Sequence, residues 1–280
     1  MSNIHKALTK RSTMVTLFGL YLSICALQPA MASEFALAAS PPRFELRVKP
    51  GERSRQVLEL TNASTAASSY SIKTADWLYG DDNSVTFQDE LSPQSCRRWV
   101  AIERRDLTIA GGKSYRYRFE VNVPADAKAG ECRFAVMLEG QEQVSVTAGG
   151  PPVPFSARLG VIVYVAIGEA EPEFSIVGTR VIQVNGVQTP ALQVRNAGLA
   201  HGRIVGFLTG TDAEKTSLEF APGNLPILPG ETRLVPLTAT RAGDSETVMQ
   251  AKFPVTITGK IEWGRGKTQT MEQRFEVGKP

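Results

Sequence analysis

The residue types that could perform catalysis are few and widely spaced. His201 is the only histidine beyond the start of the chain, where the other is His5. A serine-hydrolase triad places a histidine between a nucleophile and a carboxylate, and no nucleophile elbow occurs near Ala200-His201-Gly202. We therefore expect His201 to be a turn or strand-end residue.

The acidic residues do not form a recognisable metal-binding or catalytic pattern either. The run Asp81 to Asn83 lacks the downstream glutamate of a standard calcium loop. Asp89 and Glu90 are adjacent, so on a strand their side chains would point to opposite faces, unlike the paired carboxylates of a glycosidase. The sequence predicts no metal, no cofactor and no enzymatic activity, with a carbohydrate-active enzyme kept as a contrasting alternative.

The first 32 residues have the pattern of a cleaved export signal. Three basic residues precede the apolar stretch from Met14 to Leu27, and Ala30-Met31-Ala32 supplies the small residues that signal peptidase reads. We expect cleavage after Ala32, with Ala36-Leu37-Ala38 as a second candidate site. No later stretch reaches ~18 apolar residues, so we expect an exported, periplasmic protein with no membrane anchor.

Charge argues against nucleic acid as a partner. Residues 1–32 contain three of the 31 basic residues and none of the 28 acidic ones, which leaves 28 of each sign in the mature chain. The sequence pI of about 8.8 belongs largely to the leader. No basic excess remains to neutralise phosphates.

Two cysteines remain after the leader, which contains Cys25, is removed. An even pair in an exported chain predicts one disulfide, between Cys96 and Cys132, with two free buried thiols as the alternative. A disulfide that closes a loop of this length contributes roughly 3–4 kcal/mol by restricting the unfolded chain.

The elements that must position these residues are strands. Apolar and polar residues alternate strictly from Tyr115 to Val123, and similar runs recur between Gly, Pro, Asn and Asp residues, without a long amphipathic helix. We expect an all-β protein of two tandem immunoglobulin-like β-sandwich domains, residues 33–168 and 169–280. Pro229-Gly230-Glu231 in the second repeats Pro50-Gly51-Glu52 in the first.

One stretch departs from this alternation. From Leu159 to Ile167 the chain is apolar at nearly every position, so both faces of the strand need cover. It is either a central sandwich strand or a strand that presents one row of side chains to another protein.

Several segments together resemble the periplasmic chaperones of chaperone–usher pili. They are Ser40 to Leu46, Val57 to Asn62, Gly111-Gly112-Lys113-Ser114-Tyr115 with the alternating strand after it, and Arg158 to Val165. The resemblance covers mainly the first domain. It implies that the last strand of that domain is donated to a pilus or surface-fibre subunit that lacks one strand, with an outer-membrane usher as a further partner.

The resemblance also implies which residues bind the subunit. The row Leu159, Val161, Val163 and Val165 is more uniformly aliphatic than the row Gly160, Ile162, Tyr164 and Ala166, so we favour the first row as the donor. Two basic residues of this family hold the terminal carboxylate of the subunit, and Arg43 and Arg158 are the candidates here. The alternative function is a structural or adhesive cell-surface or cell-wall protein built of tandem sandwiches.

Overall fold

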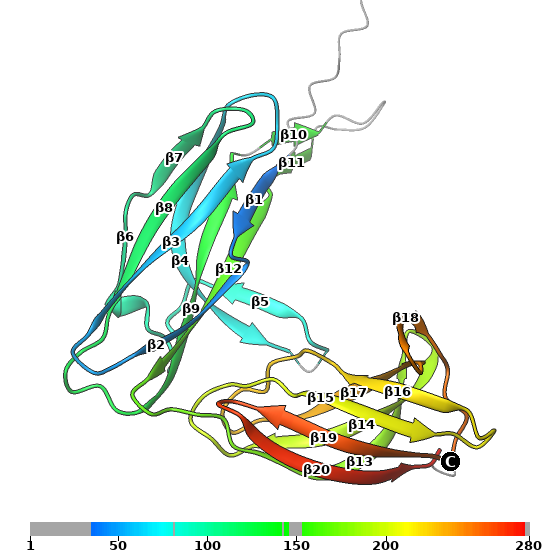
Figure 1. The fold of residues 1–280 in the computed structure, drawn as a ribbon. Coiled ribbons are helices and arrows are strands. Elements are labelled where there is room, and N and C mark those ends of the chain that lie inside the picture. The colour runs from blue at the N-terminus through cyan, green and yellow to red at the C-terminus, as the bar shows by residue number, and fades with distance from the viewer. Residues whose placement is uncertain (1–34, 81, 142, 146–152, 278–280) are drawn as a thin grey trace, which may run out of the picture. The chain divides into compact units, whose positions relative to one another are not determined.

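The structure is a computed structural model that describes residues 35–280, apart from residues 81, 142, 146–152 and 278–280 (Figure 1). The expected signal peptide and its cleavage site after Ala32 lie outside the described residues. Within the described part of the chain, no helix is long and apolar enough to cross a membrane. The described residues form one compact unit.

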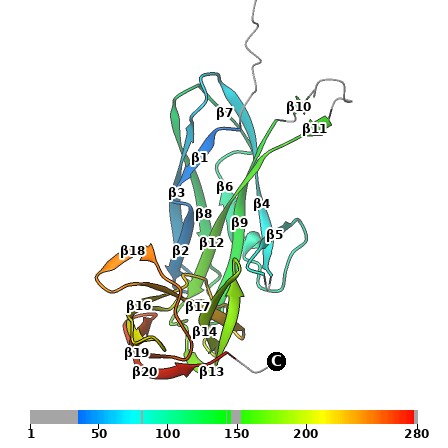
Figure 2. The same ribbon diagram turned by 90° about the vertical axis from the view of Figure 1, so that its right-hand side faces the viewer.

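The first half of this unit is a β-sandwich of two sheets (Figures 1 and 2). One sheet has the strand order β1 (Leu37–Ser40), β3 (Arg53–Asn62), β8 (Ser114–Asn122) and β6 (Val100–Ile102). The other has the order β2 (Arg43–Val48), β12 (Arg158–Ile167), β9 (Gly130–Gly140), β4 (Ser68–Tyr79) and β5 (Val85–Gln88), with β7 (Asp106–Ile109) also on β4.

The chain changes sheets between β1 and β2. Strand β1 pairs antiparallel with β3, whereas β2 pairs parallel with β12 in the opposite sheet. Between them lie Pro41 and Pro42, which have no backbone N–H to donate to a sheet. As a result, β2 lies beside only the segment Ile162–Ile167 of β12.

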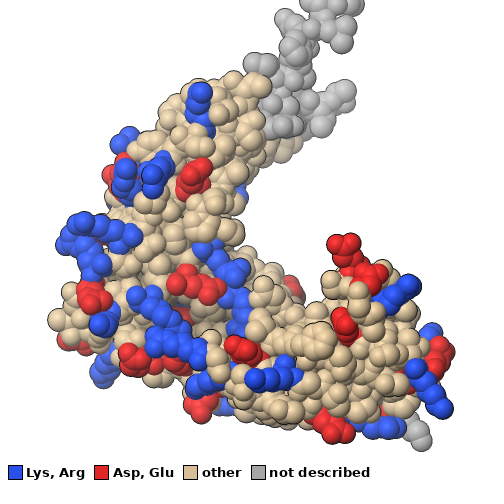
Figure 3. Space-filling view, viewed as in Figure 1, with Lys and Arg blue, Asp and Glu red and all other residues tan. Residues whose placement is uncertain are grey.

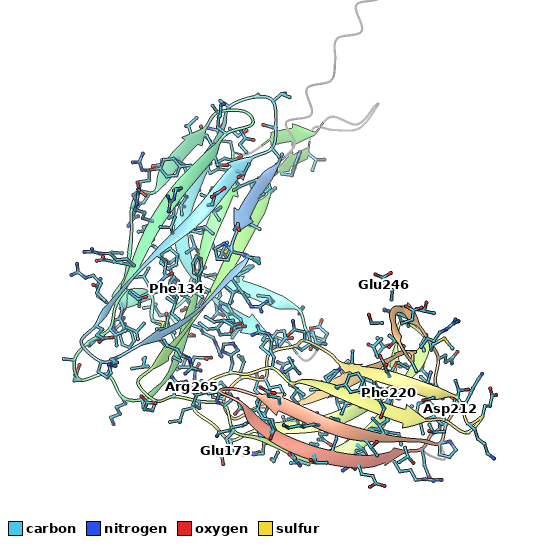
Figure 4. All side chains as sticks on the ribbon, in the orientation of Figure 1. Phe134, Glu173, Asp212, Phe220, Glu246 and Arg265 are labelled. Atoms are coloured by element: carbon cyan, nitrogen blue, oxygen red, sulfur yellow. A yellow bond between two sulfur atoms is a disulfide. The ribbon has the colours of Figure 1, made fainter. Side chains whose placement is uncertain are left out.

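The core of this sandwich lies between inward-facing rows of side chains. On β8 these are Tyr117, Phe119 and Val121, each at most 3% exposed, as the alternating pattern predicts. Phe134 of β9 is fully buried against them and forms an edge-to-face pair with Phe119 at 6.0 Å (Figure 4). Cys132, also on β9, forms a disulfide with Cys96, with a Cα–Cα distance of 5.3 Å.

The second half is another all-β sandwich. Its strands follow one hydrogen-bonded path: β13 (Phe174–Val184), β14 (Val187–Asn196), β17 (Thr232–Arg241), β16 (Ser217–Pro222), β15 (Val205–Thr211), β19 (Val255–Trp263) and β20 (Lys267–Phe275), with β18 (Asp244–Val248) on β17. Strand β17 pairs with β14 up to Pro236 and with β16 from Leu237, so it connects the two layers. Phe220 (Figure 4) and Leu208 lie in the core between these layers. The predicted class of two β-sandwiches is therefore confirmed.

The choice of donor row on β12 needs correction. Val161, Val163 and Val165 are at most 1% exposed and belong to the core of their own sandwich, and Leu159 packs against that core. The side chains of these three valines cannot also enter a partner. The aliphatic row is more uniform because it fills the interior, and the row Gly160, Ile162 and Tyr164 faces the outside of the sheet.

Charged side chains are mixed on the surface. On the face in Figure 3, basic and acidic side chains lie beside one another rather than in separate patches. This agrees with the equal numbers of both signs after the leader.

Candidate partner-binding site

Strand β12 is paired on both sides along only part of its length. Strand β9 pairs with all of it, from Arg158 to Ile167, whereas β2 pairs only from Ile162 onward. Along Arg158–Val161, β9 is the sole strand partner among the described strands. The opposite edge of this segment can accept another strand.

An exposed apolar row leads into this free edge. Strands β10 (Gln143–Ser145) and β11 (Val153–Phe155) extend β9 and β12 as a two-stranded ribbon (Figure 2). Val153 is 55% exposed and Phe155 is 46% exposed. Ser156 and Ala157, which lie outside the strands, separate them from β12, where Leu159 is half-buried. Two exposed apolar side chains thus precede the free edge of β12.

The two arginines predicted from the sequence are not adjacent. Arg43 is opposite Ile162 in the parallel ladder, four positions along β12 from Arg158, which corresponds to ~13 Å along a strand. Arg158 instead forms a surface ion pair with Glu139 of β9, at 3.2 Å. Arg158 is therefore not the second member of an arginine pair.

Arg203 takes that position. It lies just before β15, and its Nη1 donates to Glu45 Oε1 at 2.5 Å. Arg43 Nε donates to the same oxygen at 2.8 Å. The arginine pair, Arg43 and Arg203, is thus brought together around one carboxylate. Sequence reasoning missed Arg203, although it lies two residues after the only histidine beyond the start of the chain.

His201 links this pair to the first sandwich. Its backbone N–H donates to Glu131 Oε2 at 2.9 Å, and its Nδ1 lies 2.6 Å from the same oxygen. Its ring stacks on Tyr164, with centroids 3.7 Å apart. Arg203 Nη1 lies 3.2 Å from its Nε2. His201 lies in the connection between β14 and β15, which agrees with the expected turn or strand-end residue, and it is also part of a charged network.

The network shifts the titration of its members. The His201 side chain has the largest effect in lowering the pKa of Glu45 to about 2; burial opposes this, and Arg203 and Arg43 lower it further. Burial alone would lower the pKa of His201, but the carboxylates of Glu131 and Glu45 outweigh it and raise that pKa. Burial also raises the pKa of Tyr164 to about 12. Glu45 is consequently an anion at neutral pH.

Two hollows open on either side of the arginine pair, and both are lined by Arg43, Arg203 and Tyr164. The charged hollow, about 420 Å³, also contains Glu45 and His201. The aromatic hollow, about 320 Å³, is lined by Trp77, Tyr79, Ile162 and Val85. Both arginines therefore contribute to the lining of each hollow, with the Arg203 side chain only 13% exposed.

This chemistry suits the binding of an anion. Arg43 has a side chain that is 46% exposed, and a guanidinium can bind a carboxylate through two parallel hydrogen bonds. Among the described residues, no group of His, Cys, Asp and Glu side chains could hold a metal ion.

The titration of His201 gives a testable dependence of stability on pH. A folded-state pKa above the ordinary 6.5 means that protonation stabilises the fold; this stabilisation is complete below pH 6.5 and is lost as pH rises through the raised pKa. The difference in free energy of unfolding between the wild type and His201→Gln should therefore shrink from pH 6 to pH 9, as measured by urea denaturation. A difference that is constant over this range would contradict the assignment.

Comparisons with known proteins found no matching family model and no matching curated protein. Solved structures do match. The class 5 fimbriae chaperone CfaA is 13% identical, with a TM-score of 0.43, over 86% of this chain and 99% of that chain. The CupB2 chaperone of Pseudomonas aeruginosa is 11% identical, with a TM-score of 0.42, over 86% and 100%. A Salmonella enterica complex of SafA pilin with the SafB chaperone matches at 9% identity and a TM-score of 0.42, over 87% and 97%. All three are described as chaperones, one of fimbriae and one in complex with a pilin.

Proposed function

We propose that this protein is a periplasmic chaperone that binds a subunit of a pilus or another surface fibre and donates a strand edge to it. The observation that supports this best is the free edge of β12, which runs from an exposed apolar row toward the arginine pair. The export signal expected at residues 1–32 would deliver the chain to the compartment where such subunits fold. An outer-membrane usher is the proposed recipient of the complex.

An added strand would provide hydrogen-bond partners for the free backbone groups of β12 and cover its exposed apolar neighbours. A subunit strand beside Arg158–Val161 would bond the backbone groups that β9 leaves free. Val153 and Phe155, exposed in this chain, would then be buried against the subunit. Full burial of such a side chain is worth ~1.5–3 kcal/mol, so two of them with part of Leu159 form a strong apolar anchor.

The position of β2 sets the direction of the added strand. Strand β2 runs parallel to β12 and begins at Arg43. A subunit strand that continues the line of β2 along the free edge, and also runs parallel to β12, would end beside Arg43. Its terminal carboxylate would then lie at the arginine pair, where the guanidiniums can bind it.

Glu45 competes for the same cations. Its Oε1 already accepts hydrogen bonds from Arg43 and Arg203. A carboxylate from a subunit must share or displace these bonds. We therefore assign Glu45 the role of an internal carboxylate that binds both arginines in the absence of a subunit. Without it, two guanidiniums would lie side by side with no negative charge between them.

The exposed row is tested by charge substitutions. Val153→Asp combined with Phe155→Asp should abolish the soluble one-to-one complex with a co-expressed fibre subunit, as measured by size-exclusion chromatography, with the melting temperature unchanged because both side chains are exposed. Val187→Asp, on an exposed position of β14, is the matched control and should leave the complex intact. Val161→Asp should unfold the first sandwich instead, because it buries a charge. Full complex formation by the double variant would contradict the proposal.

The role of the arginine pair is tested by substitutions that should change the affinity for the subunit in opposite directions. Arg43→Ala or Arg203→Ala should weaken binding of the subunit by about tenfold or more, since a charge-assisted pair is lost. Glu45→Gln should strengthen it, because the competing negative charge is removed. Isothermal titration with subunits that carry a free or an amidated C-terminus measures both. Equal affinity for the two termini would exclude the carboxylate role.

A further inference from the structure

The aromatic hollow lies directly beside the arginine pair. Its floor is the outward row of β12, in which Ile162 and Tyr164 follow Gly160. Trp77 of β4 meets Tyr164 edge to face, with centroids 5.5 Å apart. Rings and aliphatic groups therefore form about half of the surface that a ligand would contact, and polar groups, including those of Asn83 and Asn224, form the rest.

The wall of the hollow is held in place before any ligand binds. It is formed by the end of the β4–β5 hairpin, with Tyr79 and Val85. Arg233 of the second sandwich donates to the carbonyl oxygens of Gly80 at 2.9 Å and Tyr79 at 3.1 Å. Its guanidinium carbon lies 3.8 Å from the centroid of the Tyr79 ring. A preformed wall lowers the ordering cost of binding.

Close packing at Gly160 also shapes the hollow. The ring of Phe87 of β5 lies where a Cβ at residue 160 would have to be. A larger residue at position 160 would require the ring of Phe87 to move. The glycine that interrupts the apolar stretch Leu159 to Ile167 therefore leaves room for the ring that covers it.

One polar group of the hollow has no partner. Trp77 is 2% exposed, and its Nε1 has no hydrogen-bond acceptor among the described residues. A buried indole N–H usually finds an acceptor. This nitrogen is itself buried, so Trp77 contributes to the hollow through its ring rather than through a hydrogen bond to the ligand.

We propose that the aromatic hollow receives the side chain of the C-terminal residue of the subunit and selects an aromatic or large aliphatic one. This inference rests on the proposed function, because a carboxylate held by Arg43 and Arg203 places the last residue at the mouth of the hollow. The two arginines line both hollows, so the carboxylate and the adjacent side chain can be bound together. The site thus discriminates between subunits by the side chain of the C-terminal residue and also binds its carboxylate.

The probes are fluorescently labelled octapeptides in which valine and threonine alternate. Each peptide ends in phenylalanine or alanine and has a free or an amidated C-terminus. Fluorescence anisotropy with the mature protein should show at least about tenfold tighter binding of the phenylalanine form with a free terminus than of the alanine form, from burial of one aromatic side chain. Val85→Trp, which narrows the hollow at an exposed position, should remove this preference and keep the affinity for the alanine form. Val187→Trp is the matched control and should keep the preference.

The outcomes separate the two proposals. Equal affinity for the phenylalanine and alanine forms, with amidation still weakening both, would overturn only the selective hollow. A preference for phenylalanine that survives Val85→Trp would also overturn it. No effect of amidation would overturn the carboxylate role of the arginine pair, and absence of saturable binding by every peptide would overturn both.

Discussion

The incomplete pairing of β12 is the constraint on which the rest of the site depends. A strand with a buried row needs its backbone groups bonded on both edges, and β2 meets that need only from Ile162 onward. Because the chain crosses between sheets at Pro41 and Pro42, the segment Arg158–Val161 keeps one open edge. The same crossing places Arg43 at the first residue of β2, so the open edge ends at a cation.

The charged groups around Arg43 favour an anion at the end of this open edge. Arg43 and Arg203 come from different sandwiches and meet on Glu45. His201 connects the same pair to Glu131 and stacks on Tyr164, whose side chain lines both hollows. The network thus joins the two sandwiches, and under the proposed function it also holds the two guanidiniums for the terminal carboxylate of a subunit.

Sequence patterns predicted the fold better than the site. The alternation from Tyr115 to Val123 is a local signal, and its apolar residues are buried in the structure. The cysteine count is a compositional signal, and Cys96 and Cys132 form the predicted disulfide. The row on β12 was assigned wrongly because an apolar face toward a core and one toward a partner have the same residue types. Arg203 was missed because its approach to Arg43 depends on tertiary contacts across 160 positions. Arg158 was favoured from the resemblance because it begins the donor-like strand, and a sequence pattern does not show which arginines meet in space.

Hydrogen–deuterium exchange with and without a bound fibre subunit tests the central claim most directly. The amides of Arg158–Val161 that do not bond β9 should exchange freely in the protein alone, since they lie on an open edge. The account predicts strong protection of these amides in the complex, together with protection of Val153 and Phe155. Unchanged exchange along this segment in a stable complex, with new protection at β20 or another edge, would contradict strand addition at β12.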